Sequence, residues 1–133
     1  HARKEGKRHT LFDHAEHNGC YQTLWNRGGP QNLGGFTVYS TLEPCVMCMS
    51  MLMTVRVSRI VWAEDDPAGG GSFMFRHPDE LPGRFKAERP ALHRGVLQEE
   101  SRALLRRFFE PKIGGGGHWS DPNNALVRLV MGE

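Results

Sequence analysis

Hydrophobic and polar positions along the first half of this chain predict two helices and two strands. Residues 13–25 place apolar side chains near one helical stripe, with Asp13 positioned to cap the first turn. Residues 36–42 alternate with the period of two that is typical of a strand. Residues 44–55 are apolar almost all round a helix, which indicates burial on several sides, and residues 58–63 predict a short apolar strand.

The second half is less regular, apart from one amphipathic helix. Residues 65–71 are typical of a turn, and residues 73–90 form an irregular segment with scattered charge and prolines. Residues 96–109 carry an apolar stripe at helical spacing, which we expect to face the core, with charges on the other side. That stripe consists of Leu97, Leu104, Leu105 and Phe108. Residues 125–131 suit either a short helix or an edge strand, and the element order predicts an α/β layered domain.

Length and composition favour one domain. The chain has 133 residues, of which 38% are hydrophobic, so we expect a single domain over residues 1–133 with a flexible segment at 1–12. The longest apolar stretch, residues 45–55, falls short of the roughly 18 residues that cross a bilayer, so we expect no membrane association. The basic, polar start shows no apolar segment of a secretory signal, which by itself says little about a longer parent protein. We expect a cytoplasmic location, or secretion for a toxin domain.

Charge and cysteine content narrow the chemistry. The formal net charge of +2 is too small to indicate a nucleic-acid binder by itself, although basic residues cluster at 3–8 and 102–107. We expect the second cluster to be a solvated helix face, with phosphate contact as the alternative. Three cysteines cannot all pair, and two of them form a C-x-x-C. Inside a cell this pattern favours metal or redox chemistry over a disulfide framework.

Two short motifs together predict a catalytic zinc site: His14-Ala15-Glu16 and Pro44-Cys45-Val46-Met47-Cys48. Such a site needs three protein ligands and one open position for water. Cys45 and Cys48 are three residues apart, so a helix places both sulfurs on one face, in a first turn whose dipole favours thiolates. With His14 as the third ligand, we expect one zinc ion per chain.

Glu16 has the position of a proton carrier. It lies two residues beyond His14, within reach of the zinc-bound water without being a ligand. A metal of this kind lowers the pKa of its water from 15.7 toward about 7. The pairing of H-x-E with P-C-x-x-C is the signature of zinc nucleobase deaminases, which predicts hydrolytic deamination of an amino-substituted ring.

Two simpler interpretations of the C-x-x-C explain less of the sequence. A structural zinc site would need a fourth ligand, for which Cys20 is the remaining cysteine, and it would leave Glu16 idle. A redox pair would leave the His-Ala-Glu motif unexplained. We therefore expect a catalytic zinc, with Cys20 as a small buried hydrophobic residue.

The motifs also carry a family resemblance. The stretch TLEPCVMC over Thr41–Cys48 resembles the zinc-binding motif of the bacterial tRNA adenosine deaminase family, within the cytidine deaminase-like superfamily, and His14-Ala15-Glu16 lies at about the upstream distance of that family. The likeness continues through Arg56–Asp66, Gly69–Ser72 and the helix ending at Phe108-Phe109. It covers roughly residues 13 to 110, and the extension 110–133 has no counterpart.

The resemblance implies a fold and a set of site residues. The fold is a three-layer α/β/α arrangement around a mixed sheet, with zinc held by His14, Cys45 and Cys48 between two helix N-termini and with Glu16 as the proton shuttle. The residues implied to contact substrate are Ala15 and Pro44 at the base pocket and Asp66 (or its neighbour Asp65) at the sugar or backbone. Apart from the resemblance, we expect Phe108-Phe109 to be half core, with one ring lining the pocket or stacking a base.

One part of the family pattern is missing. In the family a helix and a β-hairpin precede the histidine motif, whereas only 13 residues precede His14 here. Either the chain is a fragment, or those elements come from another chain or a different topology. We accordingly expect a homodimer, or completion of the fold by a missing N-terminal segment.

Several substrates stay open at this stage. The resemblance favours adenosine in tRNA or another single-stranded nucleic acid, where an unpaired base can enter the pocket. The alternatives are a small-molecule deaminase of guanine, cytosine or a nucleoside, and a secreted toxin domain that deaminates cytosine or adenine in DNA or RNA. A fourth hypothesis is a non-enzymatic partner subunit that keeps zinc. Glu16 argues against it, because an inactive subunit would be expected to lack the proton carrier.

Overall fold

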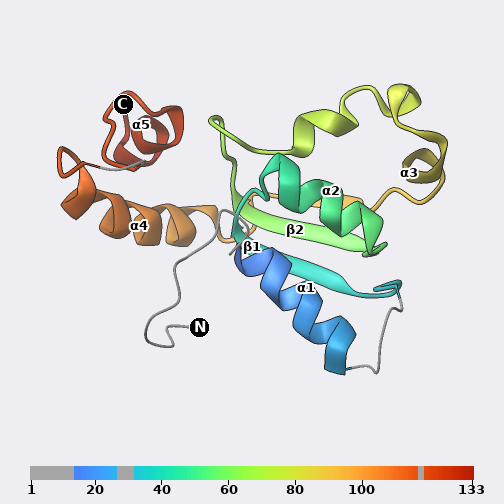
Figure 1. The fold of residues 1–133 in the computed structure, drawn as a ribbon. Helices are drawn as coiled ribbons and strands as arrows, with labels where there is room; N and C mark the ends of the chain where they lie inside the picture. Colours follow the sequence, from blue (N-terminus) through green and yellow to red (C-terminus); the bar gives the residue numbers. More distant parts are fainter. Residues whose placement is uncertain (1–13, 27–31, 117–118) are drawn as a thin grey trace.

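The fold comes from a computed structural model that describes residues 14–26, 32–116 and 119–133. Figure 1 shows the arrangement of its helices and strands. The main elements are α1 (Ala15–Asn26), β1 (Thr37–Leu42), α2 (Val46–Thr54), β2 (Arg59–Glu64), α3 (Gly83–Ala87), β3 (Ala91–Arg94), α4 (Gln98–Phe109) and α5 (Ala125–Met131). Short 3-10 turns lie at Ser72–Phe75, Pro78–Glu80 and Glu110–Lys112.

The described strands form one parallel sheet in the order β1-β2-β3. Tyr39 is in register with Val61, and Val61 with His93. The predicted α/β class is confirmed. The sheet was expected to be mixed, whereas both described strand pairs are parallel. The reason is the connectivity: α2 lies between β1 and β2, and α3 lies between β2 and β3, as parallel crossovers require.

The core lies on the sheet face that α1 and α2 cover. Ile60 and Trp62 of β2 are buried there against Cys20 of α1 and against Met49 and Leu52 of α2. The alternate residues of β2 point to the opposite face, because successive strand side chains alternate. There Val61 and Ala63 line a small cavity of about 260 Å³ together with the start of α4, so helices contact both faces of the sheet.

Most predicted elements are confirmed, and residues 125–131 form a helix. Asn124 caps this helix, since its side-chain oxygen accepts hydrogen bonds from the amides of Leu126 and Val127. The strand β3 was not predicted. It has four residues that are mostly exposed, so it lacks the apolar alternation by which a strand is recognised.

The expected orientation of α4 is wrong for three of the four stripe residues, and the fourth, Leu105, is half-buried. Leu97, Leu104 and Phe108 are exposed, by 68%, 57% and 47% respectively. The buried side of the helix carries Ser101 and Phe109 instead. The reason is that α4 extends beyond the sheet toward α5 (Figure 1). The C-terminal half of α4 thus joins a second apolar cluster, formed by Phe109, Leu126, Val127 and Val130.

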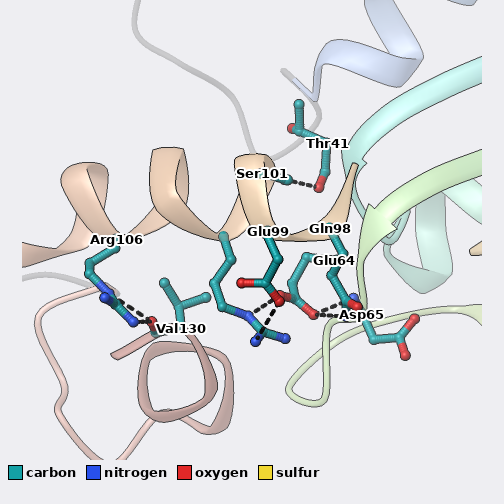
Figure 2. Close-up of polar contacts among 9 residues, drawn as sticks. Thr41, Glu64, Asp65, Gln98, Glu99, Ser101, Arg106 and Val130 are labelled. Atoms are coloured by element: carbon teal, nitrogen blue, oxygen red, sulfur yellow. Dashed lines mark hydrogen bonds and ion pairs between the residues drawn. The ribbon is translucent and has the colours of Figure 1, made fainter. Parts of the chain in front are cut away.

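Two basic residues of α4 hold neighbouring elements, although Arg106 and Arg107 are exposed, as expected for a solvated helix face. Arg102 donates a 2.6 Å hydrogen bond from Nε to the buried carboxylate of Glu64 at the end of β2. Arg106 donates from Nε and Nη2 to the carbonyl of Val130 in α5, at 3.1 and 3.0 Å. Figure 2 shows these contacts together with the bond from Ser101 to the carbonyl of Thr41. Polar side chains therefore tie α4 to both the sheet and α5.

Two further expectations concern the whole chain. In the described residues no helix is long and apolar enough to cross a membrane. The predicted flexible segment 1–12 lies outside the described residues, and the single domain over residues 1–133 stays a prediction.

Candidate metal centre and active site

The two sequence motifs meet at the N-termini of two helices. His14 immediately precedes α1, Cys45 is the N-cap residue of α2, and Cys48 lies in its first turn. The Nδ1 atom of His14 is 3.6 Å from Sγ of Cys45 and 3.5 Å from Sγ of Cys48. One ligand atom from each of the three residues lies within 4.8 Å of the others, so the group is able to hold a metal ion.

The donor set and its spacing fit zinc. Zinc–sulfur bonds of about 2.3 Å and zinc–nitrogen bonds of about 2.05 Å at a tetrahedral angle separate the two donor atoms by about 3.6 Å. The separations between His14 Nδ1 and the two sulfurs are 3.6 and 3.5 Å. Two sulfurs and one imidazole are also the donors of a three-ligand catalytic zinc site with one open position.

The backbone at the start of α2 places the two sulfurs. Cys45 has an extended conformation, with φ −64° and ψ 168°, and its carbonyl accepts the first helical hydrogen bond from the amide of Met49 at 2.8 Å. Cys48 follows three residues later and is fully buried. A three-residue separation across a helix start puts both side chains on the same side, which is why the C-x-x-C spacing serves a metal.

Burial dominates the electrostatics of this group. Burial raises the pKa of the Cys48 thiol far above its ordinary value, and the charges of Glu16 and Cys45 add to the effect. A divalent cation among the three side chains would reverse the balance, because metal binding displaces the thiol proton.

Glu16 lies between the metal group and a cavity. Its Oε2 atom is 3.8 Å from Sγ of Cys48. Glu16 and Ala15 also line a cavity of about 490 Å³, which runs between α1 and the open edge of β1 and whose further lining residues include Cys20, Thr23 and Phe36. That volume is in the range of small-ligand sites. A carboxylate in this place reaches both the ligand atoms and a molecule in the cavity.

Both aspartates after β2 have hydrogen-bond partners. The Oδ1 atom of Asp66 accepts from the amides of Ala68 and Gly69, at 2.9 and 3.1 Å, and so shapes the loop. Asp65 accepts from Nε1 of Trp62 at 2.8 Å, and its carboxylate is 3.4 Å from Arg94. Substrate contact by Asp66 stays a prediction.

The other expected substrate residues differ in their distance from the centre. Pro44 is buried directly before Cys45, and its carbonyl accepts a hydrogen bond from the amide of Gly71 at 2.9 Å. Phe108 lies in the last turn of α4, where Nζ of Lys112 stands 3.9 Å from its ring centre. Figure 1 shows this end of α4 well away from the N-termini of α1 and α2. The structure therefore brings Pro44 to the centre but not Phe108.

Two buried carboxylates were missed at the sequence level. Glu43 precedes Pro44 and is 7% exposed, and Glu64 ends β2 and is 1% exposed. A signal for Glu64 was present, because it directly follows the apolar strand residues, and all positions of β2 from Ile60 onward are buried. Glu43 had no comparable pattern, since its environment is formed by a loop from later in the chain.

Comparisons with known proteins agree with this geometry. The family model of the cytidine and deoxycytidylate deaminase zinc-binding region matches residues 2–64. The tRNA-specific adenosine deaminase of Rickettsia felis is 31% identical over 111 residues, which cover 83% of this chain and 74% of that protein. The tRNA-specific adenosine deaminase of Bacillus subtilis is 39% identical over 83 residues, covering 61% of this chain and 49% of that protein.

A solved structure shows the same fold. It comes from work on A-to-I editing by tRNA:A34 deaminases at the wobble position of transfer RNA, and it aligns with a TM-score of 0.56 and 27% identity. The alignment covers 71% of this chain and 66% of that structure. The chain spans about half the length of several curated relatives that it matches, among them the Bacillus subtilis protein. By its sequence, its fold and its His-Cys-Cys group, the chain belongs to the tRNA-specific adenosine deaminase family of zinc-binding deaminases.

Proposed function

We propose that this chain is a zinc-dependent hydrolytic deaminase, with His14, Cys45 and Cys48 as the metal ligands and Glu16 as the catalytic proton carrier. The observation that carries the proposal is the convergence of the three donor atoms within 4.8 Å, with the Glu16 carboxylate 3.8 Å from one of the sulfurs. A bound zinc ion would lower the pKa of its water, so that hydroxide is available as a nucleophile at neutral pH.

Proton transfer in the proposed reaction falls to Glu16. In the overall reaction, water replaces an exocyclic amine on the ring by oxygen, and ammonia leaves. Glu16 Oε2 takes one proton from the attacking water and delivers it to a ring nitrogen, and then carries the second proton, from the added hydroxyl, to the departing amine. Such a role typically contributes about 10²–10⁴-fold in rate. Because Glu16 also lines the cavity, the same carboxylate faces the substrate.

The substrate we propose is adenosine in tRNA. The two relatives named above support it, because both are tRNA-specific adenosine deaminases. The match covers 74% of the Rickettsia felis protein and 49% of the Bacillus subtilis protein. The cavity beside Ala15 and Glu16 is large enough for one base that has left its stack. A tRNA substrate in turn favours a cytoplasmic location, and we propose a homodimer as the assembled form.

Ammonia release measured against a panel of substrates tests this proposal. With zinc-loaded chain, turnover of adenosine in tRNA should exceed that of free adenosine, guanine, cytosine and single-stranded DNA. Affinity for tRNA should also fall steeply as salt increases, because phosphate contacts release counterions. Equal turnover of a free base would favour the small-molecule alternative, and preferred turnover of single-stranded DNA would favour the toxin alternative.

Glu16→Gln separates catalysis from metal binding. The variant should keep about one zinc per chain and lose at least about 10²-fold in turnover, because the amide cannot carry the proton. Glu99→Gln, at an exposed acid on α4, is the matched control and should retain full turnover. Unchanged turnover in Glu16→Gln would refute the assigned role. Sedimentation analysis at several protein concentrations tests the dimer.

A further inference from the structure

Glu43 is a buried carboxylate that binds both ends of one loop. Its Oε2 atom accepts a hydrogen bond from the amide of Asp66 at 2.9 Å, and its Oε1 atom accepts one from the amide of Ser72 at 2.8 Å. Within residues 14–26, 32–116 and 119–133, no basic side chain forms an ion pair with it. The charge of Glu43 is thus held by backbone amides of the loop between β2 and the following 3-10 turn.

Two glycines let this loop approach closely. A Cβ atom on Gly70 would lie 2.3 Å from the Glu43 carboxylate, so a side chain cannot fit there while the carboxylate is in place. A Cβ atom on Gly71 would lie 2.7 Å from Cβ of Met49 and 3.1 Å from the carbonyl oxygen of Cys45. The neighbouring Gly69 differs, since its Cβ would meet only Asp66, at an ordinary 3.5 Å.

The loop in turn holds the backbone of a proposed metal ligand. Gly70 forms an isolated antiparallel bridge with Cys45, and the amide of Gly71 donates to the carbonyl of Pro44 at 2.9 Å. Cys45 is the N-cap of α2, but no side chain caps this helix. N-cap residues normally fix a helix start through a side-chain bond, so here the loop contacts take over that task.

We propose that Glu43 is a positioning residue for the metal centre: by binding both ends of the loop it presses Gly70-Gly71 onto Pro44-Cys45 and so fixes Cys45 Sγ relative to His14 and Cys48. This inference deepens the proposed function and rests on the same three ligands. It does not depend on the substrate. Groups behind metal ligands typically change metal affinity about 10–100-fold when they are removed, and Glu43 acts in this way through the loop.

Binding of Co²⁺ and Zn²⁺ to the full chain tests the proposal. Glu43→Ala should weaken Zn²⁺ binding in a chelator competition by about 10–100-fold, and it should shift or weaken the thiolate-to-Co²⁺ absorption. Glu43→Gln should fall between Glu43→Ala and the unchanged chain. The glutamine oxygen still accepts from one loop amide, while its NH₂ group faces the other amide donor.

Matched controls separate positioning from general loss of stability. Leu126→Ala, in the cluster between α4 and α5, should lower the melting temperature and leave the Co²⁺ absorption unchanged. Gly71→Ala should reproduce the metal defect without touching Glu43, whereas Gly69→Ala should bind Zn²⁺ normally. Gly71→Ala and Glu43→Gln also keep the test decisive if Glu43→Ala does not fold.

A double-mutant cycle gives the sharpest test. Gly70→Ala alone should weaken Zn²⁺ binding because its Cβ meets the carboxylate, but in a Glu43→Ala background it should add little further loss. Zn²⁺ affinity of Glu43→Ala within twofold of the unchanged chain, or full additivity of the two changes, would overturn the inference. Zn²⁺ binding that follows these expectations in every variant, together with no ammonia release from any substrate by the unchanged chain, would instead refute the proposed function alone.

Discussion

Replacing Arg102 by methionine should destabilise the chain by about 3 kcal/mol at pH 7, because it leaves the carboxylate of Glu64 buried without its cation. The Glu64 side chain is 1% exposed and accepts three hydrogen bonds: from Arg102 at 2.6 Å, from Gln98 at 2.9 Å and from the Asp65 amide at 3.2 Å. Breaking a buried ion pair by removing one partner costs about 3–5 kcal/mol. The lower end applies here, since Gln98 and the amide remain and Arg102 is 28% exposed.

Urea unfolding of the zinc-loaded chain measures this cost. Glu99→Gln is the matched control: Glu99 pairs with the same arginine at 3.6 Å but is 82% exposed, so its loss should cost less than about 1 kcal/mol. In Glu64→Gln/Arg102→Met the buried charge is absent, and the double variant should recover part of the stability lost by Arg102→Met alone. If Arg102→Met costs no more than Glu99→Gln, the buried pair does not contribute as argued.

The same pair predicts a pH dependence. Burial opposes ionisation of Glu64, but the hydrogen bonds from Arg102 and Gln98 and the charge of Arg102 outweigh it, so folding lowers the pKa of Glu64 below its ordinary 4.5. A lowered pKa contributes stability that is fully present above pH 4.5 and is lost as the pH falls through the folded value. The deficit of Arg102→Met should therefore be smaller below pH 4.5 than at neutral pH. A deficit that grows on acidification would contradict the sign.

Four further predictions concern the metal centre, the two sides of α4 and the cap of α5. Cys48→Ser should reduce zinc, measured by atomic absorption, from about one per chain to a trace, because it removes one of the three donors in the group. Phe109→Ala should lower the free energy of unfolding by about 3–5 kcal/mol, since Phe109 is 2% exposed. Leu104→Gln should change the free energy of unfolding, measured by urea titration, by less than about 0.5 kcal/mol, since Leu104 is 57% exposed. A large loss would indicate that Leu104 is buried, as the apolar stripe predicted. Asn124→Ala should cost about 1 kcal/mol in thermal unfolding by removing the cap of α5, and no change would show that the cap is dispensable.

The sequence alone determined which residues make up the proposed metal site. Cys45 and Cys48 are local neighbours on one helix turn, and Glu16 is two residues from His14, so each half of the site follows from short-range geometry. The elements α1, β1, α2 and β2 were also predictable, because their periodicities are set by burial against a common core. The joining of the two halves was inferred from chemistry, and the geometry places them together.

Only the tertiary structure decided how α4 packs and what Glu43 binds, because both depend on residues that are distant in sequence. The apolar stripe of α4 predicted one buried face, but the helix leaves the sheet and packs through Ser101, Arg102 and Phe109, because Glu64 and α5 supply partners that are distant in sequence. Glu43 likewise has no local signal. Its partners are amides 23 and 29 residues away, so its role arises only when the loop after β2 folds back onto the start of α2. Periodicity reports which residues avoid water, whereas long-range contacts determine which buried charges and glycines hold the site.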